Sequence, residues 1–175
     1  METMDAFLIA YQHHLRAAVG WMELGLPRET LQEIGGLPIA IREHPKVLQL
    51  RWSLLSDLEE WSQAFSVAEK WLEKEPRNPG TWVSRAFAAR RRPGGSIAEA
   101  FALLEPAAAI FPGEAVIPFN LACYQVQLGD LAAAREWWSL ALCRGDRDDL
   151  LRMALGDADL EPLWPEFRSL PAPSA

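Results

Sequence analysis

The chain has little cysteine and no long apolar run, and each shortage excludes a class of protein. Its two cysteines, Cys123 and Cys143, are too few for a disulfide scaffold, so we expect a reduced, cytoplasmic protein. No apolar stretch reaches about eighteen residues, which excludes a transmembrane helix. The first residues, 1–5, carry acids where a signal peptide would carry Lys or Arg.

Positive charge is also in short supply. The chain has 17 basic and 24 acidic residues, for a formal net charge of -7. Non-specific nucleic-acid binding requires a basic face that neutralises phosphates, and an anionic membrane surface attracts the same kind of face. The composition therefore argues against both partners. Half of the chain is hydrophobic, which is enough for a substantial core.

Groups that could form a metal or catalytic site are sparse. His13 and His14 are adjacent, so on a helix their side chains point about 100° apart and cannot share one ion. Cys123 has no histidine in its half of the chain to act as a base, so it is a poor candidate for a nucleophile. We expect no metal, no cofactor and no enzymatic activity.

What the sequence does contain is an internal repeat. Three predicted second helices carry the same ladder of small and large residues, and their first alanines lie 36 and 34 residues apart. Each preceding helix has an anchor at an equivalent place. The ladders are Ala64, Ala68, Trp71, Pro76; Ala100, Leu104, Ala107, Pro112; and Ala134, Trp138, Ala141; the anchors are Trp52, Ala86 and Ala122.

This pattern resembles the tetratricopeptide-repeat (TPR) family, and the chain is similar to small bacterial TPR proteins of unassigned function. The resemblance implies an all-α, right-handed superhelical solenoid of helical hairpins. We predict a single TPR domain over residues 1–170, with a disordered tail at 171–175. The units are 6–44 (degenerate), 45–78, 79–114 and 115–146, followed by a cap at 147–168.

The first unit and the cap are the least regular parts of the pattern. In the first unit, Asp5 is a candidate N-cap for a helix from Ala6 to about Leu24, and Ala18 and Gly25 align with Ala122 and Gly129. In the cap, we predict that Asp159 is the N-cap of a final turn. The apolar residues expected to cover the last hairpin are Leu150, Leu151, Leu155, Leu160, Leu163 and Trp164.

The resemblance also implies a function, because the first helices of TPR hairpins line a concave groove that binds peptides. On this reading the chain is a non-catalytic adaptor for a protein or peptide segment. The basic pair Arg90 and Arg91 favours an acidic partner. The predicted peptide-binding residues are Phe87, Arg90, Arg91, Phe119, Asn120, Cys123 and Gln127.

Alternatives remain for both the function and the groove. The chain could be a dedicated chaperone for an exported partner, since class II type III secretion chaperones are also small, acidic, cytosolic TPR proteins. The groove could be filled by the protein's own N-terminal helix or by a second subunit, so self-association is a further candidate.

Overall fold

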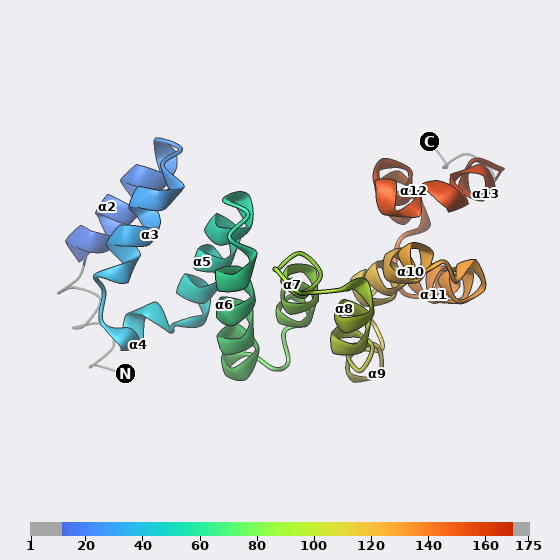
Figure 1. Ribbon diagram of the computed structural model, residues 1–175, viewed down its shortest axis with the longest axis horizontal. Helices are drawn as coiled ribbons and strands as arrows, with labels where there is room; N and C mark the ends of the chain where they lie inside the picture. Colours follow the sequence, from blue (N-terminus) through green and yellow to red (C-terminus); the bar gives the residue numbers. More distant parts are fainter. Residues whose placement is uncertain (1–11, 170–175) are drawn as a thin grey trace. The chain divides into compact units, whose positions relative to one another are not determined.

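A computed structural model describes residues 12–169, and every regular element in that range is a helix (Figure 1). The all-α prediction is confirmed. The chain divides into two compact units at Glu75 and Pro76, and each unit is described by itself. The helix start predicted at Asp5 and Ala6 and the tail at 171–175 lie outside the described residues.

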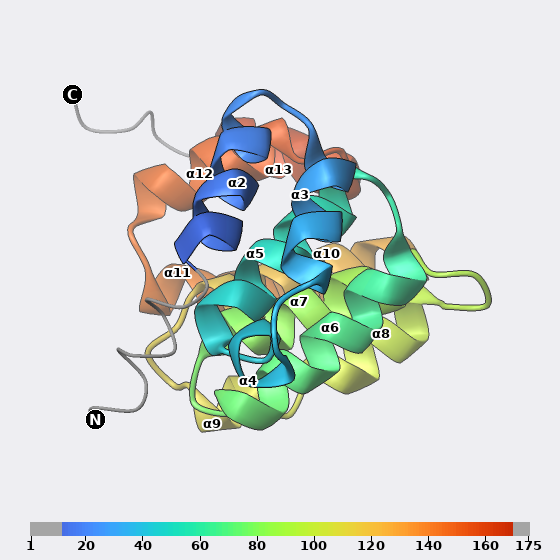
Figure 2. The same cartoon turned by 90° about the vertical axis from the view of Figure 1, so that its left-hand side faces the viewer.

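Unit 1 contains two helical hairpins joined by a short helix. In the first hairpin, α2 packs against α3, as Figure 2 shows. Proline occupies the first turn of the second helix in this hairpin and of the first helix in the next, where its missing N–H group costs nothing. The elements are α2 (Gln12–Glu23), α3 (Pro27–Gly35), α4 (Ile39–Arg42), α5 (Pro45–Asp57) and α6 (Trp61–Lys74).

Unit 2 contains two further hairpins and a C-terminal group of short helices. The first hairpin pairs α7 with α8, and the second pairs α10 with α11. The elements are α7 (Pro79–Ala89), α8 (Ile97–Leu104), α9 (Ala107–Ile110), α10 (Val116–Leu128), α11 (Leu131–Arg144), α12 (Arg147–Gly156), the 3-10 helix η1 (Ala158–Leu163) and α13 (Trp164–Ser169).

Short polar side chains set where the helices of unit 2 begin. Asn78, Ser96 and Asp130 each accept a hydrogen bond from a backbone N–H in the first turn of the helix that follows, and Asp146 accepts two. These bonds satisfy donors that have no partner within the helix. Gly129 ends α10 in the left-handed conformation, with φ of 84°, which a residue with a side chain rarely adopts. The α10–α11 turn is therefore encoded locally.

The repeated small residues lie where the helices of each hairpin approach. Ala64 and Ala68 in unit 1, and Ala86, Ala122 and Ala134 in unit 2, are fully buried. The ladder also supplies large side chains to the cores, since Trp71 and Trp138 are buried as well. A methyl group at these contact points allows close packing, and the bulky residues fill the space beside it.

One predicted N-cap is wrong. Asp157, not Asp159, caps η1, and its carboxylate accepts a hydrogen bond from the backbone N–H of Asp159. The Asp159 carboxylate instead pairs with Arg90. Within residues 12–169, no helix is long and apolar enough to cross a membrane.

Candidate functional site

The predicted peptide-binding residues all lie in unit 2, on the first helices of its two hairpins. Phe87 is on α7, and Arg90 and Arg91 follow directly after that helix ends at Ala89. The other four lie on α10, whose bounds are Val116–Leu128. We call this set the α7–α10 surface: Phe87, Arg90, Arg91, Phe119, Asn120, Cys123 and Gln127.

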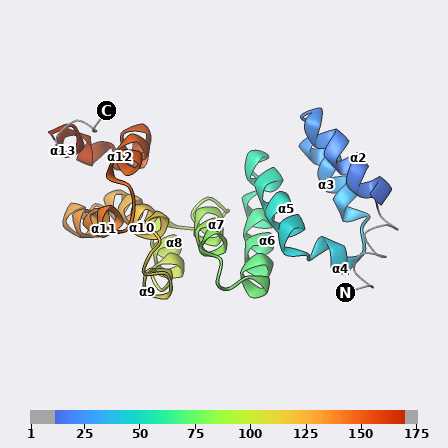
Figure 3. The ribbon, with the colours of Figure 1, turned by 180° about the vertical axis from the view of Figure 1, so that it is seen from behind.

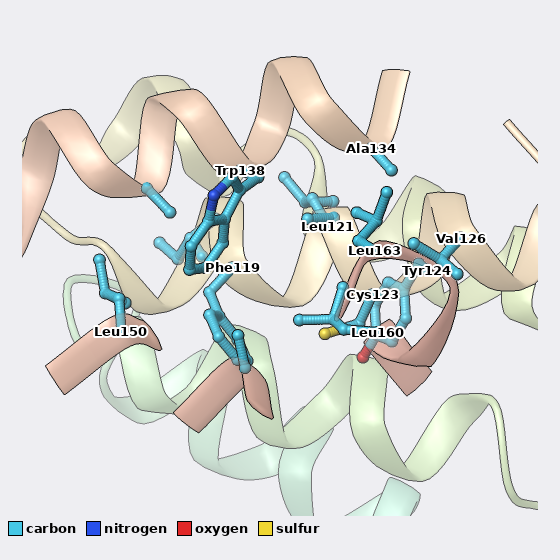
Figure 4. Close-up of a cluster of buried hydrophobic side chains, with 14 of the residues drawn as sticks. Phe119, Leu121, Cys123, Tyr124, Val126, Ala134, Trp138, Leu150, Leu160 and Leu163 are labelled. Atoms are coloured by element: carbon cyan, nitrogen blue, oxygen red, sulfur yellow. The ribbon is translucent and has the colours of Figure 1, made fainter. Parts of the chain in front are cut away.

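The chain's own C-terminal segment lies against this surface. Figure 3 shows α12 and α13 beside the α10–α11 hairpin, and η1 contacts α10. Leu160 and Leu163, both from η1, are fully buried and belong to the same core cluster as α10. In Figure 4 they lie close to Cys123, Tyr124 and Leu121. The C-terminal segment is thus part of the core of unit 2.

Two predicted groove residues are therefore not on the open surface. Phe119 is 5% exposed and Cys123 is 3% exposed. The Phe119 ring packs edge-on against Trp138 with 6.2 Å between centroids, and the Trp138 ring in turn lies 4.6 Å from the ring of Phe167 on α13. The expectation that these residues face a groove fails because the C-terminal helices cover them.

The Cys123 thiol lies beside a carboxylate of the covering segment. Its sulfur is 3.5 Å from Oδ2 of Asp157, to which it donates a weak hydrogen bond. Burial, followed by the negative charge of Asp157, raises the pKa of Cys123 far above its ordinary value. Both effects favour the protonated thiol over the thiolate. The structure places Cys123 in the core of unit 2, whereas the sequence predicted a small residue facing the groove.

The basic pair of the α7–α10 surface has two different environments. The Arg90 side chain is only 10% exposed, and its Nη1 lies 2.6 Å from Oδ2 of Asp159. The Arg91 guanidinium lies against the Phe87 ring, 3.5 Å from its centroid, and donates a hydrogen bond to the Phe87 carbonyl. Burial, and then the charge of Arg90, lowers the pKa of Arg91. Arg90 is therefore paired with the C-terminal segment, whereas Arg91 is stacked on Phe87.

Arg90 also lies near a buried phenol. Its guanidinium carbon is 5.4 Å from the ring centroid of Tyr124, and burial raises the pKa of Tyr124 to about 12. The Tyr124 hydroxyl is buried and has no hydrogen-bond partner among residues 12–169. The phenol therefore remains neutral at physiological pH, and the attraction of its ring for Arg90 adds to the ion pair.

The rest of the α7–α10 surface is more accessible. Asn120 is half-buried and donates from Nδ2 to the Val116 carbonyl, 2.8 Å away in the preceding turn. Gln127 is exposed near the end of α10. Phe87 and Arg91 are half-buried. Of these four side chains, Gln127 is exposed and the other three are half-buried.

Sequence reasoning missed the two aspartates that hold this segment in place. Asp157 contacts Cys123, 34 residues earlier, and Asp159 contacts Arg90, 69 residues earlier. The sequence did contain a signal for this contact. Asp157 and Asp159 follow the first apolar residues of the cap, and the basic pair Arg90 and Arg91 offers them opposite charge. No local spacing rule links residues this far apart, however. Within residues 12–169, no group of three or more His, Cys, Asp or Glu side chains could hold a metal ion.

Comparison with known proteins bears on the fold. No family model and no curated protein sequence matches the chain. Solved structures do match. The structure "MamA MSR-1 C2" has a TM-score of 0.61 at 16% identity, over 75% of each chain. The structure "MamA RS-1 ArsTM double mutant" has a TM-score of 0.64 at 14% identity, over 84% of this chain and 78% of the other.

A third match is TTC0263, a thermophilic TPR protein of Thermus thermophilus. Its TM-score is 0.59 at 16% identity, over 90% of this chain and 95% of the other. This chain has the TPR fold. In TPR terms, α7 and α10 are the first helices of their hairpins, as the sequence pattern predicted. The C-terminal segment therefore crosses the face of α10 that the TPR pattern assigns to the groove.

Proposed function

We propose that this TPR protein is a non-catalytic adaptor that binds an acidic protein or peptide segment at the α7–α10 surface. The observation that carries the proposal is the contact between Arg90 and Asp159. The chain's own segment 157–167 combines acids with buried apolar residues, and this surface holds it through an ion pair and apolar packing. The surface thus already accommodates the type of segment expected in a partner.

The seven residues of the surface divide into two roles in this proposal. Arg90, Phe119 and Cys123 hold the C-terminal segment, because each contacts it directly or packs against a residue that does. The four accessible side chains contact the partner. The Phe87 ring with Arg91 stacked on it supplies apolar area and positive charge, a combination common where interfaces bind tightly. The side-chain amides of Asn120 and Gln127 add hydrogen-bonding capacity.

The test begins with capture of partners on the immobilised protein, followed by calorimetry with each purified candidate. Arg91→Glu should weaken binding at least about tenfold, which is about 1.4 kcal/mol. Arg152→Glu is the matched control, because it makes the same charge change at an exposed position on α12. Circular dichroism checks that both variants fold. If Arg91→Glu binds normally while Arg152→Glu does not, the partner site is elsewhere.

The same purified partner separates the adaptor from the chaperone. An adaptor binds its partner in the folded state, whereas a dedicated chaperone binds it before folding or assembly. Calorimetry with native and with denatured partner distinguishes the two. Light scattering of the protein alone shows whether a second copy is the partner.

A cytoplasmic location remains our expectation from the two cysteines, neither of which forms a disulfide.

A further inference from the structure

Unit 1 contains a polar cavity that the proposed function does not use. It lies between α5 and α6 and has a volume of about 370 Å³. Val67 is a buried apolar residue in its wall, while Arg51 and Lys70 bring positive charge. The lining residues are Arg51, Ser62, Gln63, Ser66, Val67 and Lys70.

Arg51 is the unusual member of this lining. Its side chain is half-buried, yet within residues 12–169 it makes no hydrogen bond and no ion pair. Burial, and then the positive charge of Arg42, lowers its pKa, and Glu43 only partly opposes this effect. A guanidinium carries five N–H donors and is costly to desolvate without an acceptor. A bound anion would therefore stabilise the Arg51 guanidinium by supplying the missing hydrogen-bond acceptors.

The charged side chains around Arg51 carry more positive than negative charge. Glu43 accepts from Lys70 at 3.0 Å and lies 3.8 Å from Lys74, and the hydrogen bond from Lys70 is the main reason that the pKa of Glu43 is lowered. Nε of Arg42 is buried without a partner among the described residues. Arg42, Arg51, Lys70 and Lys74 all interact with this single carboxylate, so the positive charges outnumber it.

A second carboxylate near the cavity is already matched. Glu60 accepts a hydrogen bond from Gln63 Nε2 at 3.4 Å, and Arg28 pairs with it at 3.3 Å. The positive excess around Arg51 is therefore not cancelled from this side. In a chain of net charge -7, such a local excess attracts an anionic group to one place without making the whole protein a polyanion binder.

We propose that this cavity binds the carboxylate of an acidic peptide segment through Arg51. The planar fork of the guanidinium matches the two oxygens of a carboxylate. The Ser62 hydroxyl and the Gln63 amide are further donors on the wall, and Val67 offers an apolar surface to the stem of a Glu side chain. The volume exceeds that of a single small anion, which favours a side chain attached to a peptide. The cavity belongs to unit 1, so it is independent of the α7–α10 surface.

The probe is the peptide acetyl-Glu-Glu-Glu-Glu-amide, titrated into the ¹⁵N-labelled full chain and followed by amide chemical shifts. We expect saturable shifts at the cavity residues of α5 and α6, and no such shifts with the matching Gln peptide. Arg51→Gln should weaken binding at least about tenfold. Lys46→Gln removes one positive charge from an exposed position on the same helix and should leave the affinity within about twofold. Arg51→Lys should also weaken binding, because it keeps the charge and loses the fork.

Three results would overturn the proposal. Equal weakening by Arg51→Gln and Lys46→Gln would show diffuse attraction to surface charge. Shifts at the cavity with inorganic phosphate but not with the Glu peptide would show a small-ion site. No saturable shift at the cavity would show that it binds neither. Melting curves of the Arg51 variants verify folding, and we expect Arg51→Gln to melt at or above the wild-type temperature, because it removes a desolvated charge without a partner.

Discussion

Helix α2 of unit 1 and helix α10 of unit 2 occupy equivalent places in their hairpins but have different surroundings. Gly25 and Gly129, 104 residues apart, both adopt the left-handed conformation after their helices, with φ of 70° and 84°. Ala18 and Ala122, at the same offset, are both buried. The two hairpins thus share one local design.

One face of these helices differs between the units. Val19 is 46% exposed, whereas its counterpart Cys123 is 3% exposed. Met22 is 42% exposed, whereas its counterpart Val126 is 8% exposed. The difference is that η1 lies against α10. On α10 this face is buried where η1 lies against it, and on α2 the hairpin alone does not bury it.

Introducing a charge at the two equivalent positions should give the largest contrast. Cys123→Asp places a carboxylate in the core beside Asp157, and we expect it to lower the free energy of unfolding by about 3–5 kcal/mol. Val19→Asp places the same group in solvent and should change it by less than about 0.5 kcal/mol. Urea denaturation followed by circular dichroism measures both. Equal losses would mean that the α2 face is also covered.

Trimming the covering segment should give the next largest effect. Leu163 is fully buried, so Leu163→Ala should cost about 2–5 kcal/mol. Leu155 makes a matched control, because it lies in the same C-terminal group but is exposed, and its replacement by Ala should cost less than about 1 kcal/mol. Alkylation gives a second readout. Cys143 is exposed and should react in the native protein, whereas Cys123 should react only after Leu163→Ala loosens the cover.

An unchanged alkylation pattern in Leu163→Ala would show that a loss of stability does not require the C-terminal segment to leave α10. If the variant unfolds at lower urea but Cys123 remains protected, the segment still covers α10 and Leu163 acts only through packing. If the variant is as stable as wild type, the apolar contact of η1 with α10 contributes little, and the difference between the two units needs another cause.

The parts of this structure that the sequence predicted are those with local rules. The alanine ladders, and the left-handed turns at the aligned glycines Gly25 and Gly129, depend on residues within a few positions of one another. Four of the six residues predicted to cover the last hairpin, Leu150, Leu151, Leu160 and Leu163, are buried, whereas Leu155 is exposed and Trp164 is half-buried.

The path of that cap could not be predicted in the same way. The sequence placed Phe119 and Cys123 on an open groove, since the TPR pattern describes hairpins and not the segments that cross them. The contacts that settle the path join residues far apart in sequence, such as Arg90 and Asp159. The error at the N-cap of η1 has the same origin, because the carboxylate of Asp159 is engaged by Arg90 and leaves the capping position to Asp157.

Removing the charge of Asp159 tests how much the ion pair with Arg90 stabilises the packing of the C-terminal segment on unit 2. Asp159→Asn leaves the largely buried Arg90 without its counter-ion and should cost about 1–3 kcal/mol. The double variant Arg90→Met with Asp159→Asn should recover part of this loss, because the unpaired charge is gone. Urea denaturation of the four proteins in this cycle measures the coupling. A coupling energy near zero would show that apolar packing alone holds the C-terminal segment against α10.

The smallest expected effect concerns two carboxylates in ion pairs, one in each unit. The hydrogen bond from Arg135 lowers the pKa of Glu166 on α13, and the hydrogen bond from Lys70 lowers the pKa of Glu43. Arg135 donates to both oxygens of Glu166, at 2.9 and 2.6 Å, whereas Lys70 donates to one oxygen of Glu43 at 3.0 Å. We therefore expect the larger lowering at Glu166, since a bidentate contact favours the ionised form more.

The sign of the pH dependence follows from these directions. A carboxylate whose folded-state pKa is lowered contributes stability that is fully present above its unfolded value, 4.5 for both groups, and is lost as the pH falls through the folded pKa. Glu166 is exposed and Glu43 is half-buried, and both pair with exposed cations, so the contribution is small and weakens with salt. Carbon-detected NMR titration measures each pKa directly. Arg135→Gln should raise the pKa of Glu166 and leave that of Glu43 unchanged, and Lys70→Gln should do the reverse. If either substitution moves both values, the two carboxylates respond to a shared field and the contacts within each unit do not explain their pKa values.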